Sequence, residues 1–140
     1  MSFLSVLVKS QKVVSLPPNA TVFEAAQTME ANKIGSIVVM DNDRLAGIFT
    51  ERDLLNRVAA KGLDAKKTAL SEVMSKNVMT GSIDETISGC FGKMESTKCR
   101  RLPIMDGKRV VGMVTMRNIL EWLFQEAEEE KNQLRKYIQS

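Results

Sequence analysis

Two seven-residue motifs in this chain carry residue types that could hold a ligand with hydroxyl and phosphate groups. Residues 47–53 are GIFTERD and residues 112–118 are GMVTMRN; each has a glycine, a threonine, an arginine and an acid or amide at the same spacing. A threonine hydroxyl can donate to a ligand oxygen, and the Asp53 carboxylate can accept from both hydroxyls of a ribose. If a helix begins after Thr50 and another after Thr115, their free backbone N–H groups would also attract an anion.

The same spacing has a structural interpretation, because threonine is a common helix N-cap. Asp53 stands three residues after Thr50, and Asn118 stands three residues after Thr115. An acid at this place suits the positive end of a helix dipole. Capping alone does not explain why the glycine and the arginine recur with the threonine. A glycine in a strand lets a ligand, or the other half of the molecule, approach the backbone closely. Both interpretations stay open on the sequence.

The composition excludes several other functions. The chain has no histidine, and its two cysteines, Cys90 and Cys99, lack the spacing of a metal site or a disulfide framework. Without a nucleophile–base pair or a metal set, we expect no enzyme and no bound metal. The mild net charge of +3 and the low aromatic content of 5% do not suit a nucleic-acid binder. The apolar runs are too short to span a bilayer and the N-terminus lacks a signal-peptide pattern, so we expect a cytoplasmic protein.

The two motifs belong to a longer internal repeat. When residues 13–55 are aligned without gaps to residues 78–120, twelve of the 43 pairs are identical, and the hydrophobic pattern recurs where identity fails. Apolar residues stand at helical spacing in both copies: Val22, Ala25, Ala26 and Met29 in the first, and Ile87, Cys90, Phe91 and Met94 in the second. The chain is therefore predicted to be a duplicated unit.

Each copy predicts the same elements around its motif. A helix begins near Thr21 with Glu24 in a capping box, and the strands GSIVVM and RLAGIF follow, joined by a turn. RLPIM and RVVGMV are the matching strands of the second copy, and a further helix follows each threonine of the motifs. A unit of about sixty residues buries too little surface to be stable alone, so we expect the two to pack sheet against sheet.

The predicted fold class is therefore α+β, a mixed α/β arrangement of strand–helix–strand–strand–helix that occurs twice. The predicted boundaries are residues 6–60 for the first unit, 61–70 for a linker, 71–124 for the second unit and 125–140 for a C-terminal helical tail. An apolar stripe interrupted by the acidic run EAEEEK marks the tail and the turns before it, at Leu120, Leu123, Ala127, Leu134 and Tyr137. We expect this tail to pack on a neighbouring subunit, with docking to another protein as the alternative.

Over residues 6–124 the chain resembles a tandem pair of cystathionine β-synthase (CBS) domains. The resemblance rests on the two motifs in register, on LSEVMS before the second copy and on RRLPIMD before its hairpin. It implies two units around a pseudo-twofold axis, with two clefts that bind AMP, ADP, ATP, NAD or S-adenosylmethionine. It also implies a regulatory module that senses such ligands and forms a homodimer.

The resemblance assigns residues to the first cleft. Asp53 would bind the ribose hydroxyls, and Thr50 would lie on the sugar–phosphate side. The opposite wall would come from the second unit, at Cys99, Arg100, Arg101, Leu102 and Pro103. The leucine and proline would enclose the base, and the arginines would face phosphates.

The second cleft would use Thr115 and Asn118, with Ile34, Gly35 and Ile37 opposite them. Here the chain departs from the family pattern, because Asn118 is neutral and a Gly–Ser pair replaces the paired arginines. We therefore expect this cleft to hold phosphorylated ligands more weakly.

The sequence favours a stand-alone regulatory module that binds an adenosine nucleotide and requires no further cofactor. It leaves open a CBS scaffold that serves only for dimerisation or interaction and has no physiological nucleotide. The expected partners are the nucleotide, a second copy of the chain and a regulated protein, with no nucleic acid and no membrane.

Overall fold

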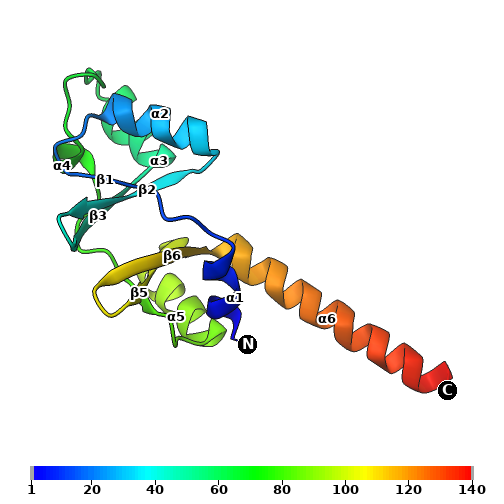
Figure 1. Ribbon diagram of the computed structural model, residues 1–140. Coiled ribbons are helices and arrows are strands. Elements are labelled where there is room, and N and C mark those ends of the chain that lie inside the picture. The colour runs from blue at the N-terminus through cyan, green and yellow to red at the C-terminus, as the bar shows by residue number, and fades with distance from the viewer. Residues whose placement is uncertain (1, 140) are drawn as a thin grey trace.

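The computed structural model describes residues 2–139, which form two similar α/β units and one long helix that leaves them (Figure 1). The last residue of the predicted tail, Ser140, lies outside the described residues, as does Met1. The first unit consists of β1 (Ser15–Leu16), α2 (Val22–Asn32), β2 (Ser36–Asp41), β3 (Arg44–Thr50), α3 (Glu51–Asp53) and the π-helical segment η1 (Leu54–Ala59). The second consists of β4 (Gly81–Ser82), α5 (Ile87–Thr97), β5 (Arg101–Asp106), β6 (Arg109–Thr115) and α6 (Met116–Gln139). A short helix precedes each unit, α1 (Phe3–Lys9) and α4 (Leu70–Val73). The predicted fold class and the C-terminal helix are confirmed.

The two units have equivalent sheets. Their strand orders are β1-β2-β3 and β4-β5-β6, with a parallel first pair and an antiparallel second pair in each. Ser36 pairs with Thr50 in one hairpin, and Arg101 pairs with Thr115 in the other. Figure 1 shows the two sheets in the middle of the body, with α2 and α3 outside one and α5 and α1 outside the other. The expected packing of sheet against sheet is therefore present.

Both faces of the middle strands are covered, and this explains their burial. Residues 37–39 of β2 and residues 102–104 of β5 are all buried, although successive side chains in a strand point to opposite faces. In the first unit, Ile37 and Val39 pack with helix residues such as Met29. The helix-side core of the second unit contains Cys90, Met94, Leu102, Ile104, Val114 and Ile119.

The helix that precedes each unit completes the core of the other unit. Leu70 and Val73 of α4, which precedes the second unit, are buried in the first core. Phe3 and Leu4 of α1, which precedes the first unit, are buried in the second core. Phe3 also lies edge-on to Trp122, with ring centroids 5.3 Å apart. Because the two helices are exchanged in this way, the core of each unit contains residues from the helix that precedes the other unit.

The recurring glycines lie where a segment from outside the unit touches a strand. A Cβ at Gly47 would lie 2.6 Å from the backbone oxygen of Ser75, and a Cβ at Gly112 would lie 2.6 Å from Cγ1 of Val8. Both distances are shorter than real Cβ contacts. Each motif therefore requires a glycine, because a segment from outside the unit comes so close to the strand. The sequence left open whether a ligand or the other half of the molecule approaches this glycine, and in the structure it is a segment of the protein.

The exchanged segments also hydrogen-bond to the strand that ends in each motif. Ser75 and Ile48 exchange two backbone hydrogen bonds of 2.9 and 3.0 Å. At the equivalent place in the second unit, the side chain of Gln11 takes this part. Its Nε2 donates to the Met113 carbonyl at 2.8 Å, and its Oε1 accepts from the Met113 amide at 2.9 Å. A side-chain amide therefore substitutes for a backbone segment at one of the two equivalent edges.

Candidate ligand-binding cleft

Thr50 and Asp53 form a reciprocal capping box at the junction of β3 and α3. The Asp53 amide donates to Thr50 Oγ1 at 3.1 Å, and the Thr50 amide donates to Asp53 Oδ2 at 3.1 Å. The other carboxylate oxygen, Oδ1, lies 3.6 Å from Arg57 Nε. The capping interpretation of this motif is thus confirmed. A carboxylate has about four lone-pair directions, so the cap leaves acceptor capacity on Asp53.

Thr115 and Asn118 repeat the cap at the junction of β6 and α6. The Asn118 amide donates to Thr115 Oγ1 at 3.1 Å, and Asn118 Oδ1 accepts from the Thr115 amide at 2.8 Å. Asn118 Oδ1 also accepts from the Thr115 hydroxyl at 2.9 Å. Asn118 has a single acceptor oxygen and the cap uses it twice, so this motif offers a ligand less acceptor capacity than the first.

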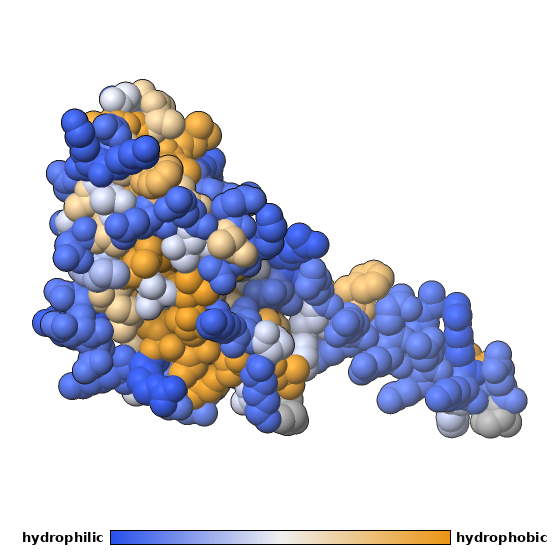
Figure 2. All heavy atoms as spheres, turned by 45° about the horizontal axis from the view of Figure 1, so that its top comes forward, coloured by the Kyte–Doolittle hydropathy of each residue, from blue (hydrophilic) through white to orange (hydrophobic). Residues whose placement is uncertain are grey.

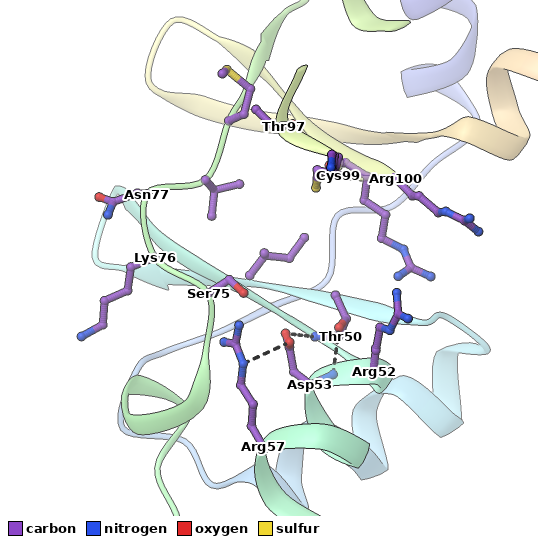
Figure 3. A pocket seen from close by; sticks show the side chains of 15 residues that line it. Thr50, Arg52, Asp53, Arg57, Ser75, Lys76, Asn77, Thr97, Cys99 and Arg100 are labelled. Atoms are coloured by element: carbon purple, nitrogen blue, oxygen red, sulfur yellow. Dashed lines mark hydrogen bonds and ion pairs between the residues drawn. The ribbon is translucent and has the colours of Figure 1, made fainter. Parts of the chain in front are cut away.

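A cleft of about 590 Å³ lies between the two units beside the first motif. Its floor is the end of β3 and the start of α3, with Thr50 and Asp53 (Figure 3). One wall is the connection that leads into the second unit, residues 75–79. The opposite wall is the turn between α5 and β5, residues 97–101. The cleft is large enough for a nucleotide-sized ligand.

Cationic side chains outnumber acidic ones along this cleft. Its lining contains six cations, Arg52, Arg57, Lys76, Lys98, Arg100 and Arg101, and one carboxylate, Asp53. The cations come from both units and from their connection. Figure 3 shows Arg52 and Arg57 rising from the floor, with Cys99 and Arg100 on the far side. Low-dielectric walls lined by one sign of charge attract an anion, so the cleft favours a phosphorylated ligand.

The structure brings together five of the residues predicted for the first cleft and leaves two out. Thr50, Asp53, Cys99, Arg100 and Arg101 all line it. Leu102 and Pro103, expected to enclose the base, are both buried and do not line the cleft. Leu102 is fully buried because its side chain points to the core beneath α5, and Pro103 lies on the covered opposite face of the same strand.

The residues predicted for the second cleft are more dispersed. Ile34 and Gly35 line a hollow of about 520 Å³, but Thr115 and Asn118 do not line it. Arg101 also lines this hollow, and a Cβ at Gly35 would lie 2.8 Å from Arg101 Nη2. Ile37 is fully buried in the first core. Arg101, which belongs to the second unit, therefore lies beside Ile34 and Gly35, where the sequence predicted the wall of the second cleft that faces Thr115 and Asn118.

Several lining residues were missed by reasoning from the sequence. Arg57 follows Asp53 by four residues, a helical ion-pair spacing that could have identified it. The wall residue Ser75 ends the stretch LSEVMS that carried the family resemblance, and the wall residues Lys76, Asn77, Val78 and Met79 directly follow it. No local pattern marks them, because they line the cleft only through the contact of Ser75 with β3.

The two cysteines differ in their surroundings. Cys90 is fully buried, and burial raises the pKa of its thiol, which keeps it in the unreactive thiol form. Cys99 lies at the cleft, and its thiol donates to the Arg101 carbonyl at 3.0 Å. Within residues 2–139, no cluster of three or more carboxylate and thiol side chains could hold a metal ion.

Comparison with known families agrees with this architecture. A family model described as "CBS domain" matches twice, over residues 7–60 and 70–125, which together are most of the chain. The chain belongs to the CBS domain family. The two matches coincide closely with the two structural units, and the predicted family resemblance is confirmed.

Individual relatives support the same assignment. The chain is 35% identical over 105 residues to the CBS domain-containing protein YhcV of Bacillus subtilis, covering 75% of this chain and 74% of that one. The CBS-domain containing protein ATU1752 from Agrobacterium tumefaciens superposes with a TM-score of 0.75 and 31% identity over 85% of this chain and 90% of that one. A hexameric CBS-CP12 protein from bloom-forming cyanobacteria superposes with a TM-score of 0.76 and 27% identity, covering 86% of this chain and 69% of that one. Among the described helices of the present chain, none is long and apolar enough to cross a membrane.

Proposed function

We propose that this chain is a regulatory module that binds an adenosine nucleotide in the cleft beside Thr50 and Asp53. One observation carries the proposal. Asp53 of the first unit, whose carboxylate can accept from ribose hydroxyls, lines the same cleft as Arg100 and Arg101 of the second unit. Binding across the two units would couple occupancy of the cleft to the position of one unit against the other. A regulated partner could then respond to the ligand.

Asp53 would accept from the ribose hydroxyls while it keeps its capping bond. Its side chain is only 13% exposed, so a hydrogen bond from a ligand there would be shielded from water. Arg57, whose side chain is 47% exposed, can move away from the carboxylate at little cost, since exposed ion pairs contribute about 1 kcal/mol or less.

The surplus of cations favours the nucleotide with the longer phosphate chain. AMP would engage the arginines nearest the ribose, whereas the additional phosphates of ADP and ATP could reach more of the six cationic side chains. We therefore propose that affinity rises from adenosine to AMP to ADP to ATP.

The base would contact the apolar part of the lining. Ile48, Val78 and Met79 line the cleft, and Met79 is 40% exposed, so it is available to a ligand. Methionine is flexible and polarisable, which suits contact with an aromatic ring. These residues replace Leu102 and Pro103 as the proposed surface for the base.

Calorimetric titration of adenosine, AMP, ADP and ATP into the purified chain tests the proposal. We expect saturable binding, and we expect thermal stability to rise by about 2.7 kcal/mol when free ligand is 100-fold above the dissociation constant. Arg100→Ala should weaken ATP more than adenosine. Arg109→Ala is the matched control, because it removes the same charge from an exposed residue at the start of β6 that does not line this cleft. The absence of heat and of any thermal shift with all four compounds would favour the alternative, a CBS scaffold without a nucleotide.

A further inference from the structure

Arg57 joins the floor of the cleft to the exchanged helix α4. Its Nη1 donates to the Val73 carbonyl at 2.9 Å, and its Nε lies 3.6 Å from Asp53 Oδ1. Val73 is the last residue of α4, two residues before Ser75, where the wall formed by residues 75–79 begins. Figure 3 shows the side chain of Arg57 between Asp53 and the segment that carries Ser75. One guanidinium therefore contacts both the proposed ribose acceptor and the connection that leads into the second unit.

Arg57 differs in this respect from two other cations of the surface. Hydrophilic residues surround the hydrophobic ones over the body of the molecule in Figure 2, and an exposed ion pair by itself contributes little to stability. Lys33 pairs with Glu30, and Arg117 pairs with Glu121, each within three or four residues along the chain. Arg57 instead also donates to a backbone carbonyl 16 residues away, so its bond restrains one element against another.

The helix that carries Arg57 departs from regular α-helical geometry. Residues 54–59 form the π-helical segment η1, and the Ala60 amide donates to the Leu55 carbonyl, five residues earlier, at 2.9 Å. The equivalent residues of the second unit, 119–124, lie in the α-helix α6. Short π-helical segments are rare and frequently occur at functional sites. The irregular geometry thus lies beside the cleft that contains Asp53, whereas its counterpart beside Asn118 is α-helical.

The second unit has a residue of another kind at the equivalent place. Trp122 corresponds to Arg57 when the internal repeat is extended by two residues. Its Nε1 donates to Glu126 Oε1 at 2.8 Å within α6, and its ring lies edge-on to Phe3 of α1. The contact between this helix and the exchanged helix is therefore aromatic in the second unit, whereas in the first unit it is a bond from a charged donor.

We propose that Arg57 is a positioning residue that couples the ribose contact of Asp53 to the connection between the two units, a role that rests on the proposed nucleotide site. Without ligand, the guanidinium bridges Asp53 and Val73 and holds the connection against the floor of the cleft. Ribose hydroxyls that donate to Asp53 Oδ1 compete with Arg57 for this oxygen. The bridge then weakens, and the connection becomes freer to move.

The two contacts of Arg57 differ in the way that such a release requires. A ligand shifts an equilibrium between two states only if it interacts differently with them. Here the difference is Asp53 Oδ1, which faces Arg57 in the bridged state and accepts from ribose hydroxyls in the released state. A hydrogen bond from a ligand hydroxyl to this carboxylate is charge-assisted, and the ion pair that it replaces is long and half-exposed.

Amide hydrogen exchange, measured by NMR, tests the bridge without any ligand. The reporter is the Ser75 amide, which donates to the Ile48 carbonyl at 2.9 Å. In Arg57→Met, which keeps an apolar stem and removes the guanidinium, this amide should exchange roughly fivefold faster or more. The Met113 amide, which donates to Gln11 at the equivalent edge of the second unit, should exchange as before. Equal Ser75 exchange in the two proteins would overturn the proposal.

Two further variants separate the bridge from a general loss of charge. Arg117→Met removes the same side chain from an exposed ion pair in α6 and should leave Ser75 exchange unchanged. Asp53→Asn removes the charge that faces Arg57, so it should speed Ser75 exchange, but less than Arg57→Met does. The double variant should then behave like Arg57→Met alone, because both changes break one bridge. Additive effects would show that the two residues act independently, contrary to the proposal.

The release is tested with ATP and 2′,3′-dideoxy-ATP, which differ only in the ribose hydroxyls. Each is added at the same multiple of its own dissociation constant, so that mass action protects the protein equally. Ser75 should exchange about two- to fivefold faster in the ATP complex, because only ATP competes with Arg57 for Asp53. In Arg57→Met the two complexes should exchange alike. Equal exchange in the two complexes of the unmodified protein, or slower exchange with ATP, would overturn the release.

Calorimetry of the same samples separates this outcome from failure of the proposed function. If ATP binds and the two complexes of the unmodified protein exchange alike, the nucleotide site stands and the coupling through Arg57 is wrong. If ATP does not bind, the proposed function and the release are both wrong. Ser75 exchange in ligand-free Arg57→Met still decides in that case whether the arginine holds the connection.

Discussion

Asp53 and Thr50 hold each other through two reciprocal hydrogen bonds of 3.1 Å at the floor of the cleft. Asn118 and Thr115 form the same cap in the second unit. The chain thus shows that an asparagine can replace the aspartate without loss of the cap. What differs between the two motifs is the charge and the second acceptor oxygen, and substitution of Asp53 by asparagine isolates these two properties.

Asp53→Asn should weaken nucleotide binding while it leaves the fold intact. A charge-assisted hydrogen bond contributes about 1.5–3 kcal/mol against about 1 kcal/mol for a neutral one, so we expect roughly a tenfold loss of ATP affinity. The free energy of unfolding should change by less than about 0.5 kcal/mol, because the cap is kept. Calorimetry and urea denaturation measure the two effects separately.

Two comparisons control this prediction. A 2′,3′-dideoxy nucleotide should bind the unmodified protein more weakly than its parent, but should lose little further affinity in Asp53→Asn, because the acceptor is already weakened. Asn118→Ala should affect affinity less than Asp53→Ala, which we expect to cost about 2 kcal/mol, or thirtyfold. If the unmodified and Asp53→Ala proteins bind ATP equally, Asp53 is only a capping residue.

Thr50→Ala and Thr115→Ala should each destabilise the protein. Both hydroxyls accept from the amide three residues later, and loss of an N-cap costs about 1 kcal/mol. Thr28→Ala is the control, because the hydroxyl of Thr28 bonds only to the Glu24 carbonyl within the same helix. It should change stability by less than about 0.5 kcal/mol in urea denaturation. Equal effects at all three positions would contradict a special role for the caps.

The duplicated fold was predictable because its signals are local. Helical and strand periodicity, the capping residues and the turns all lie within a few residues of one another, and two copies in register reinforce each weak signal. Burial of Met29 and Cys90 follows from this periodicity. The capping bonds of Thr50 and Thr115 follow from the three-residue spacing in the same way.

The walls of the cleft were less predictable, because they depend on contacts between segments far apart in the chain. Lys76 and Met79 line the cleft only because Ser75 pairs with Ile48. Leu102 was expected at the cleft, but β5 is covered on both faces and Leu102 faces its helix-side core. A strand buried on both faces shows no alternation of polar and apolar residues, so its sequence does not tell which side chain faces which neighbour.

Gly47→Ala should destabilise the protein by about 1–3 kcal/mol. The added Cβ would meet the Ser75 carbonyl oxygen at 2.6 Å and Met74 Sδ at 2.8 Å, so the exchanged segment would have to move. Gly92→Ala is a matched control. Nothing lies within 4 Å of a Cβ there, and in the interior of α5 alanine should stabilise by about 0.5–1 kcal/mol. Thermal melts of both variants check this prediction, and a neutral Gly47→Ala would contradict the close packing of the segment.

Glu85 and Lys93 should make stability depend on pH in the acid range. Lys93 Nζ lies 2.8 Å from Glu85 Oε2 and also donates to the Thr80 carbonyl at 2.9 Å, so it links α5 to the chain before β4. The hydrogen bond from Lys93 holds the pKa of the Glu85 carboxyl below its ordinary value of 4.5. The folded protein therefore binds this proton less readily than the unfolded chain does, and the stabilisation is fully present above the unfolded pKa. It is lost as the pH falls below about 4.5 and through the folded pKa.

Urea denaturation should accordingly find Glu85→Gln less stable than the unmodified protein at pH 7, with a difference that shrinks towards pH 3. Lys93→Gln should also be less stable at pH 7, and the double variant should lose less than the sum of the two single losses, because they remove one shared interaction. A Glu85→Gln difference that is the same at pH 7 and pH 3 would show that this pair does not carry the pH dependence.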